Sequence, residues 1–214
     1  MNALVVGACP VTGSAGLYRR LAGSADVVIA ADAAGEWCVD AGRDPDVALG
    51  DFDSSQPGAA DRLAAQGIRI IAFPAEKDAS DLDLCVQEAL RLGATAIDLT
   101  ACTAGRLDHA LAALGTLCSI PCGSGRIIEP AMRVHVLDAS ATHELRLSVI
   151  PGSIVSVMAV GPASGVSLSG LRYPLHEAPL DLLSSLALSN VALEPEITVT
   201  AATGTLLVII GQPE

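Results

Sequence analysis

Two carboxylates stand one residue apart, directly after a short apolar stretch. Residues 47–50 read Val-Ala-Leu-Gly, and Asp51 and Asp53 follow. Alternate residues of an extended or tightly turned segment point the same way, so both acids can converge beyond the carboxyl end of a strand, where open α/β sheets bind ligands. Converging carboxylates repel each other unless a cation lies between them. The pair therefore favours a divalent metal that also holds phosphate oxygens. The alternative is a polar turn whose acids cap the next segment.

A second acid-rich turn, residues 76–83, precedes a helix predicted over residues 82–92. Ser80 and Asp83 have the spacing of a capping box, which would explain both residues without a ligand. Lys77 is the only lysine of the chain. It precedes a helix N-terminus, where backbone N–H groups bind phosphate. Its interpretation stays open between a phosphate contact and a solvated ion pair.

A turn of small residues over 101–105 opens another predicted helix, which runs to about Leu117. The backbone N–H groups of the turn, the helix dipole and the guanidinium of Arg106 are expected to face one anion. Asp108 is placed either to orient Arg106 or to bind a metal. His109 is expected to be a packed or capping histidine rather than a base.

Apolar stretches and helix signals alternate along the first 130 residues. We predict strands over residues 3–7, 26–31, 47–50, 69–73 and 96–100, with further helices over 14–21, 33–41 and 57–66. This alternation is typical of a parallel sheet. The acid-rich turns named above, together with Asp32 after the second strand, all follow predicted strands.

The pattern changes near residue 130. Short β-like segments separated by Gly and Pro turns follow, over residues 133–137, 144–149, 154–159, 166–168, 191–193, 197–200 and 206–210. This is the pattern of an antiparallel sandwich or roll. We therefore predict a mostly parallel α/β sheet domain, residues 1–130, followed by an all-β sandwich domain, residues 131–214.

Composition excludes several classes of protein. The net charge of −12 and the pI near 4.6 argue against a nucleic-acid surface. Hydrophobic residues make up 51% of the chain, which indicates a subunit interface, yet no uninterrupted apolar run reaches the roughly 18 residues of a membrane span. The six cysteines lack C-x-x-C spacing, so free thiols are expected. The N-terminus has no basic segment, and a cytoplasmic location is expected.

Five motifs occur in an order that is characteristic of one family. They are Pro-Asp-x-x-x-Gly-Asp-Phe-Asp-Ser over residues 45–54, Lys-Asp-Ala-Ser-Asp over 77–81, Gly-Arg-Leu-Asp-His over 105–109, Gly-Leu-Arg-Tyr-Pro-Leu over 170–175, and Ser-Asn at 189–190. With them the chain resembles the thiamine pyrophosphokinases (thiamine diphosphokinases), and the match spans both predicted domains.

The resemblance implies an enzyme that transfers the β,γ-diphosphate of Mg-ATP to the hydroxyl of thiamine, giving thiamine diphosphate and AMP. It implies that the first domain is catalytic and binds nucleotide and metal, that the second binds thiamine, and that a homodimer forms active sites between its subunits.

The resemblance also assigns residues. The expected Mg²⁺ ligands are Asp51, Asp53 and Asp81, which are also expected to be catalytic together with Arg106 and Asp108. Expected contacts to the nucleotide come from Asp32, Lys77, Asp78, Ser80, Gly105 and Arg106. Expected contacts to thiamine come from Tyr173, Ser189 and Asn190. Since aromatic residues are only 2% of the chain, Tyr173 in its turn is a plausible platform for a flat cationic ring.

Four alanines depart from the family pattern. Ala33 and Ala34 replace a glycine pair, and Ala104 and Ala113 replace a glycine and an asparagine. These changes bear on nucleotide affinity and on the choice of heterocycle. Three alternatives remain: a diphosphokinase for another hydroxyalkyl heterocycle such as a pterin, a haloacid-dehalogenase-like phosphatase with Asp51 as nucleophile, and a non-catalytic thiamine or nucleotide sensor. The phosphatases usually carry this motif on their first strand, and here it follows the third. No P-loop motif occurs.

Overall fold

The computed structural model describes residues 1–53, 55–76 and 78–213, so Lys77 and Ser54 lie outside the described residues. The chain divides into two compact units. The first contains residues 1–120 and 127–130. The second contains residues 121–126 and the chain from Ala131 onward.

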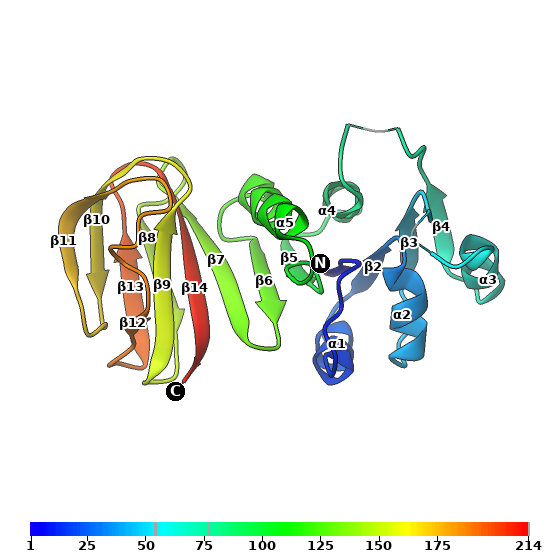
Figure 1. Ribbon diagram of the computed structural model, residues 1–214, viewed down its shortest axis with the longest axis horizontal. Coiled ribbons are helices and arrows are strands. Elements are labelled where there is room, and N and C mark those ends of the chain that lie inside the picture. Colours follow the sequence, from blue (N-terminus) through cyan, green and yellow to red (C-terminus); the bar gives the residue numbers. More distant parts are fainter. Residues whose placement is uncertain (54, 77, 214) are drawn as a thin grey trace. The chain divides into compact units, whose positions relative to one another are not determined.

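Strands and helices alternate in the first unit (Figure 1). Its strands are β1 (Asn2–Val6), β2 (Val27–Ala31), β3 (Val47–Gly50), β4 (Arg69–Ala72) and β5 (Ala96–Thr100), with most of β6 (Gly125–Glu129), whose first two residues belong to the second unit. Its helices are α1 (Ala15–Ala22), α2 (Ala34–Asp40), α3 (Ala59–Ala65), α4 (Asp81–Arg91) and α5 (Leu107–Ser119). The strand order is β6-β5-β1-β2-β3-β4. The neighbouring pairs β5–β1, β1–β2, β2–β3 and β3–β4 are all parallel.

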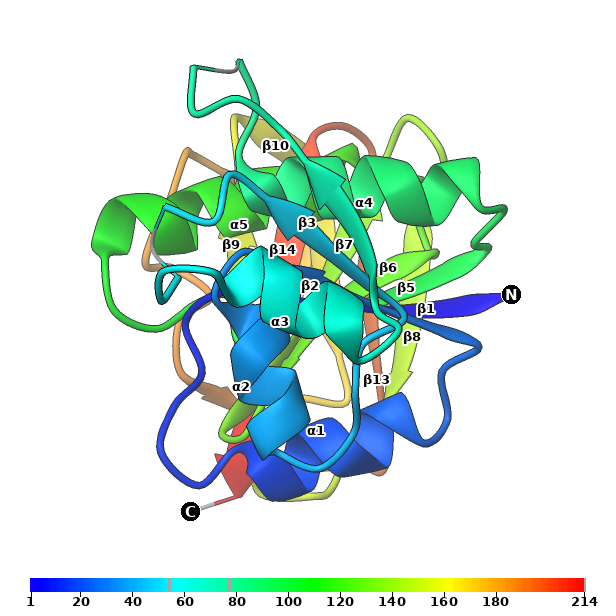
Figure 2. The same ribbon diagram turned by 90° about the vertical axis from the view of Figure 1, so that its right-hand side faces the viewer.

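Helices cover both faces of this sheet. Helices α1, α2 and α3 lie on one face, and α4 and α5 lie on the other (Figures 1 and 2). Strands β1, β2 and β3 are apolar and almost entirely buried, as expected for a parallel sheet covered on both sides. On the α1 and α2 face, Leu4, Val6 and Val28 pack with Tyr18 and Cys38.

The order of the strands creates a switch point. The chain proceeds from β1 through β2, β3 and β4 in one direction, and β5 then pairs with the other edge of β1. The connections that leave β1 and β5 therefore diverge, and open α/β sheets bind ligands at such a point. The carboxyl ends of these parallel strands share one edge of the sheet, and the acidic turns follow them.

The second unit is an antiparallel sandwich. One of its layers has the order β12 (Asn190–Val191), β9 (Ser153–Ala159), β14 (Thr205–Pro213) and β7 (Met132–Asp138). The facing layer has the order β11 (Leu175–Leu180), β10 (Ala163–Ser169), β13 (Glu196–Thr200) and β8 (Glu144–Ser148). Leu137, Val157, Leu168, Ile197 and Leu206 belong to the core that the two layers enclose.

The predicted fold class is confirmed, since a parallel α/β sheet precedes an antiparallel sandwich. Two strands were not predicted. β11 contains Pro179 and polar residues, which weaken a strand pattern, and β6 is short and follows a Gly-rich turn. The boundary at residue 130 stays a prediction. Among the described residues, no helix is both long and apolar enough to cross a membrane.

Candidate active site

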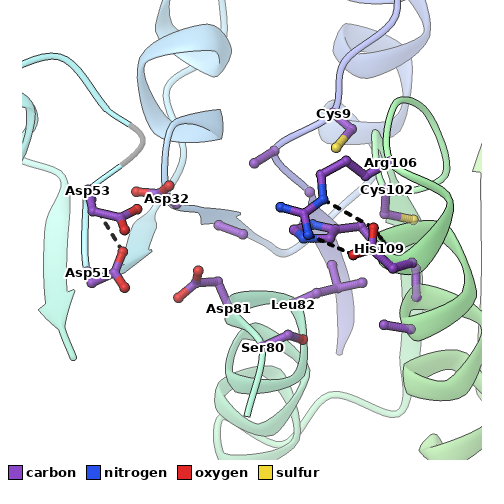
Figure 3. Close-up of a pocket in the computed structure, with 16 residues that line it drawn as sticks. Cys9, Asp32, Asp51, Asp53, Ser80, Asp81, Leu82, Cys102, Arg106 and His109 are labelled. Atoms are coloured by element: carbon purple, nitrogen blue, oxygen red, sulfur yellow. Dashed lines mark hydrogen bonds and ion pairs between the residues drawn. The ribbon is translucent and has the colours of Figure 1, made fainter. Parts of the chain in front are cut away.

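A cavity of about 620 Å³ opens at the carboxyl edge of the parallel sheet (Figure 3). The segments that follow β1, β2, β3 and β5 line it, together with the first turns of α4 and α5. Its volume is that of a site for a drug-sized ligand. Figure 3 shows acidic side chains at one end and Arg106 with His109 at the other.

Three carboxylates form the acidic end, which we call the acid cluster: Asp32, Asp51 and Asp53. One oxygen of each lies within 4.8 Å of the others, and Asp32 is only 5% exposed. The structure thus brings Asp51 and Asp53 together as the spacing predicts, and Asp32 joins them. Asp81, the third expected metal ligand, lines the same cavity from the first turn of α4 but is not part of this cluster.

Local backbone geometry builds the acid cluster. Asp32 and Phe52 both have left-handed conformations, with φ of 48° and 58°, which turn the chain sharply after β2 and within the Asp-Phe-Asp segment. The N–H of Asp53 donates to Oδ1 of Asp51 at 3.3 Å. A Cβ on Gly50 would lie 3.2 Å from the backbone of Asp32, so glycine at this position lets the end of β3 approach the end of β2 closely.

The donor chemistry of the acid cluster suits Mg²⁺. Carboxylate oxygens are ligands that this hard cation prefers, and three of them this close repel one another unless positive charge balances them. Neither acid caps α3, because Gly58 occupies its N-cap position. Asp51 does accept from the N–H of Asp53, as in a polar Asx turn, so the turn and the carboxylate cluster occur together.

The turn before α4 contains a helix cap, formed by Ser80 and Asp83, and one of these residues also lines the cavity. Ser80 Oγ accepts from the N–H of Asp83 at 3.1 Å, and the N–H of Ser80 donates to Oδ2 of Asp83 at 3.1 Å, which confirms the predicted capping box. Thr116 Oγ1 on α5 also donates to Asp83, at 2.5 Å. Ser80 lines the cavity, whereas Asp78 is exposed and lies outside the described lining.

At the other end of the cavity, Arg106 and Asp108 form a two-point ion pair. Nε of Arg106 donates to Oδ1 of Asp108 at 3.1 Å, and Nη2 donates to Oδ2 at 2.6 Å. Both side chains are exposed, 71% and 64%. The guanidinium lowers the pKa of Asp108 to about 2, with a smaller contribution from the N–H of His109. Gly105 has a φ of 80° and provides the left-handed turn before α5, but it does not line the cavity.

The backbone N–H groups of the turn after β5 were predicted to face an external anion, and for residues 101–103 this prediction is wrong. The N–H groups of Ala101, Cys102 and Thr103 all donate to the carboxylate of Glu129, at 3.2, 2.9 and 3.2 Å, and Thr103 Oγ1 adds a contact at 3.1 Å. Glu129 is the last residue of β6. The sequence carries no signal for this contact, because no local motif marks a carboxylate that lies 26 to 28 residues from the amides it binds.

Three further side chains line the cavity beside Arg106. His109 is exposed there, so the packed form of the expected packed or capping histidine is wrong. Cys9 and Cys102 have raised pKa values, first because of burial and then because of the negative charge of Glu129. These two thiols therefore stay protonated at neutral pH and are poor nucleophiles.

In the second unit, Asn190 holds the backbone of Tyr173. Oδ1 of Asn190 accepts from the N–H of Tyr173 at 3.0 Å, and Nδ2 donates to its carbonyl at 2.7 Å. Asn190 is only 3% exposed, so its amide positions the turn rather than facing solvent. The Tyr173 ring is 63% exposed. Ser189 has a φ of 55°, and its N–H donates to Ser156 Oγ at 3.0 Å.

Two family models match the chain. The thiamin pyrophosphokinase catalytic domain matches residues 18–127, and the thiamin pyrophosphokinase vitamin B1 binding domain matches residues 142–206. The first match contains the acid cluster, Asp81 and Arg106, and the second contains Tyr173 and Asn190.

Individual proteins are similar over most of the chain. Thiamine pyrophosphokinase 2 of Arabidopsis thaliana is 27% identical over 72% of this chain and 61% of its own length. The Bacillus subtilis thiamine pyrophosphokinase is 29% identical over 80% of each. The crystal structure of the B. subtilis protein superposes with a TM-score of 0.82, at 24% identity over 99% of both chains. The structure of the thiamin pyrophosphokinase from Candida albicans superposes with a TM-score of 0.79, at 14% identity over 99% of this chain and 89% of that chain. From the two matched models, the chain belongs to the thiamin pyrophosphokinase family.

Proposed function

We propose that the chain is a thiamine diphosphokinase, which transfers the terminal diphosphate of ATP to thiamine. The observation that carries this proposal is a single cavity with an acid cluster at one end and the Arg106–Asp108 pair at the other. Family membership supports the choice of both substrates.

In the proposed reaction, the hydroxyl oxygen of thiamine bonds to the β-phosphorus of ATP. The bond from that phosphorus to the oxygen it shares with the α-phosphate breaks, the hydroxyl proton is lost, and AMP leaves. Catalysis of such a transfer consists mainly of positioning and of balancing negative charge.

The acid cluster and Asp81 have the donor set for Mg²⁺. When bound, Mg²⁺ would neutralise phosphate charge and draw the polyphosphate toward the acidic end of the cavity. Asp32 is fixed by burial, and it accepts from Ser55 Oγ at 3.2 Å. Asp51 and Asp53 are fixed by their shared turn.

Arg106 is proposed to contact the transferred phosphates. Guanidinium has five N–H donors in a rigid fork, and Asp108 uses donors on Nε and Nη2 only. The remaining donors can bind a phosphate oxygen while Asp108 holds the fork in its orientation. Asp108 is thereby a positioning residue for Arg106, which is one of the two roles that its sequence position allowed.

Thiamine is proposed to stack on Tyr173 within a homodimer, where the ring serves the active site of the partner subunit. Exposed apolar side chains gather in one segment of the second unit, and a partner could cover them: Leu182, Leu183, Leu186 and Leu188. A mixed dimer of Tyr173→Ala and Asp51→Asn subunits would then contain one intact site. It should recover up to about half of the activity of a wild-type dimer. Mixing that restores nothing after verified subunit exchange would contradict a site shared between subunits.

The alanines that depart from the family pattern differ in their relation to the site. Ala33 and Ala34 are not among the described residues that line the cavity, whereas Ala113, which stands where the family pattern has asparagine, does line it. The sensor alternative therefore rests on Ala113 and is decided by the turnover assay. Asp51 follows the third strand rather than the first, and both family models that match describe thiamin pyrophosphokinase domains.

The proposed function is tested by incubating the protein with ATP, Mg²⁺ and thiamine and identifying the products. Equal amounts of AMP and thiamine diphosphate are expected. ADP with thiamine monophosphate, or inorganic phosphate released from a phosphomonoester, would overturn the proposal. Binding of thiamine without turnover would identify a sensor, and turnover of a hydroxymethyl pterin alone would identify the other diphosphokinase.

A further inference from the structure

The loop between β5 and α5 contains a nest of backbone amides that is already filled. Three successive N–H groups, of residues 101, 102 and 103, point at the carboxylate of Glu129. Concave arrangements of successive amides bind anions, commonly phosphates. In this chain the anion belongs to the protein itself, and it comes from a neighbouring strand of the sheet.

The filled nest fixes an otherwise unfavourable conformation. Ala101 has a φ of 54°, which is uncommon for a residue with a side chain. Its N–H binds Glu129, and its carbonyl accepts from the N–H of Cys9 at 2.9 Å. A Cβ on Gly7 would lie 2.6 Å from that carbonyl, so the loop packs closely against the segment after β1.

Arg106 depends on this loop for its position. It is the N-cap residue of α5, three residues after Thr103, and its side chain reaches solvent rather than a packed surface. Its side chain contacts Asp108. Its backbone lies between α5 on one side and residues 101–103, which bind Glu129, on the other. If the nest opened, Gly105 and its neighbours could adopt other conformations.

We propose that Glu129 is a positioning residue, a built-in anion that fills the nest after β5 and thereby fixes Arg106 at the phosphate end of the cavity. The catalytic part of this inference rests on the proposed diphosphokinase function. Because Glu129 fills the nest, these three amides are not open to the ATP phosphates, which are left to Arg106 and, through a bound cation, to the acid cluster.

Two variants at position 129 and one control separate the effects of charge and of side-chain volume. Glu129→Gln keeps the shape, but its amide NH₂ must face an N–H donor that now binds a carboxylate oxygen. Glu129→Ala empties the nest, and a small carboxylate such as acetate can refill it. Asp138→Asn is the matched control, because Asp138 also accepts a backbone N–H, from Ser140 at 2.9 Å, outside the first unit.

We expect kcat to fall about tenfold in Glu129→Gln and further in Glu129→Ala, at temperatures well below the Tm of each variant. Acetate, but not chloride at equal ionic strength, should restore several-fold activity to Glu129→Ala only. The Asp138→Asn control should retain wild-type kcat. An unchanged kcat in both Glu129 variants, or a loss that acetate does not relieve, would overturn the positioning role.

Amide hydrogen exchange of residues 101–103 provides a readout that needs no activity. These amides should exchange slowly in the wild-type protein, faster in Glu129→Ala, and slowly again with acetate. If the wild-type protein makes no thiamine diphosphate, the proposed function fails while this pattern still supports the filled nest. Fast exchange in the wild-type protein would overturn the nest itself.

Discussion

The two ends of the cavity are held in place by different means. At the acidic end, Asp51 and Asp53 sit in one tight turn, and only Asp32 comes from a neighbouring strand end. At the other end, Arg106 is oriented by Asp108 two residues away, but its loop is fixed by Glu129 from β6. The acidic end is therefore encoded mainly in local spacing. The arginine end depends on a contact between residues far apart in the sequence.

The two ends also differ in charge balance. Three carboxylates converge at the acidic end, which attracts a cation, whereas the guanidinium of Arg106 is already matched by Asp108. Loading with Mg-ATP should therefore change the electrostatics of the acidic end far more than those of the arginine end. Substitutions that remove charge from the two ends should differ in size accordingly.

The largest effect is expected at the acid cluster. Asp51→Asn or Asp53→Asn should lower kcat by about 10²-fold or more, because one charge is lost from the site that neutralises phosphate. The Tm of the metal-free protein should not fall and should rise slightly, since asparagine keeps the size of the side chain and removes one of three repelling charges. Steady-state kinetics and thermal unfolding measure the two quantities.

Asp61→Asn is the matched control for the acid cluster, because Asp61 is an exposed carboxylate on α3 outside the cavity. It should leave kcat unchanged. Unfolding of both cluster variants would instead favour the interpretation of these acids as structural turn residues. Near-normal activity with an intact fold would remove the metal assignment.

A smaller effect is expected at the arginine end. Arg106→Lys keeps the positive charge but loses the planar fork, so kcat/KM for ATP should fall by about an order of magnitude. Arg146 offers a matched control, because it forms the same two-point pair with Glu144, at 2.7 and 3.1 Å, in the second unit. If Arg106→Lys loses no more activity than Arg146→Lys, Arg106 is structural.

The same contrast explains what the sequence could predict. Periodic apolar stretches indicated the parallel sheet, and the one-residue spacing of Asp51 and Asp53 indicated their convergence. The capping box of Ser80 and Asp83 was equally local. Glu129 could not be found this way, because its partners are backbone amides, which have no sequence signature, and β6 itself was not predicted.

A contact with distant backbone also occurs in the second unit. The amide of Asn190 binds the backbone of Tyr173, 17 residues away, and no sequence pattern indicates this contact. The expected contact of Asn190 with substrate stays a prediction. In the first unit, the expected contact of Asp32 with the nucleotide stays a prediction. Its closeness to Asp51 and Asp53 is visible only in the structure, where the left-handed turn after β2 directs it toward them. The sequence thus predicts that acids follow the strands, whereas only the structure shows which of these acids lie close together.

Tyr173 extends the comparison to a residue whose backbone is held by a distant side chain, that of Asn190. Tyr173→Ala should raise KM for thiamine several-fold and leave KM for ATP nearly unchanged, because stacking and cation–π attraction act on the flat cationic ring alone. Tyr173→Phe keeps the ring and should bind thiamine almost normally. Equal increases in both KM values would show that the turn, not the ring, was lost.

The smallest expected effect concerns the protonation of Asp108, and it tests whether the Arg106 fork exists in solution. In the folded protein the pKa of Asp108 is lowered to about 2 by Arg106, against an ordinary value of about 3.9. Because the folded-state pKa lies below the unfolded one, the pair stabilises the fold fully above about pH 4, and this contribution is lost as the pH falls toward 2. Between pH 5 and 8 Asp108 stays ionised, so any acid limb of kcat/KM in that range must come from another group.

Carboxyl NMR titration should give a pKa near 2 for Asp108 in the wild-type protein, and Arg106→Gln should raise it toward the ordinary value. High salt should raise it in the wild-type protein as well, since both side chains are exposed and screened. A wild-type pKa near 4 at low salt would mean that the two-point pair does not persist in solution, and the arginine end would then rely on Glu129 alone.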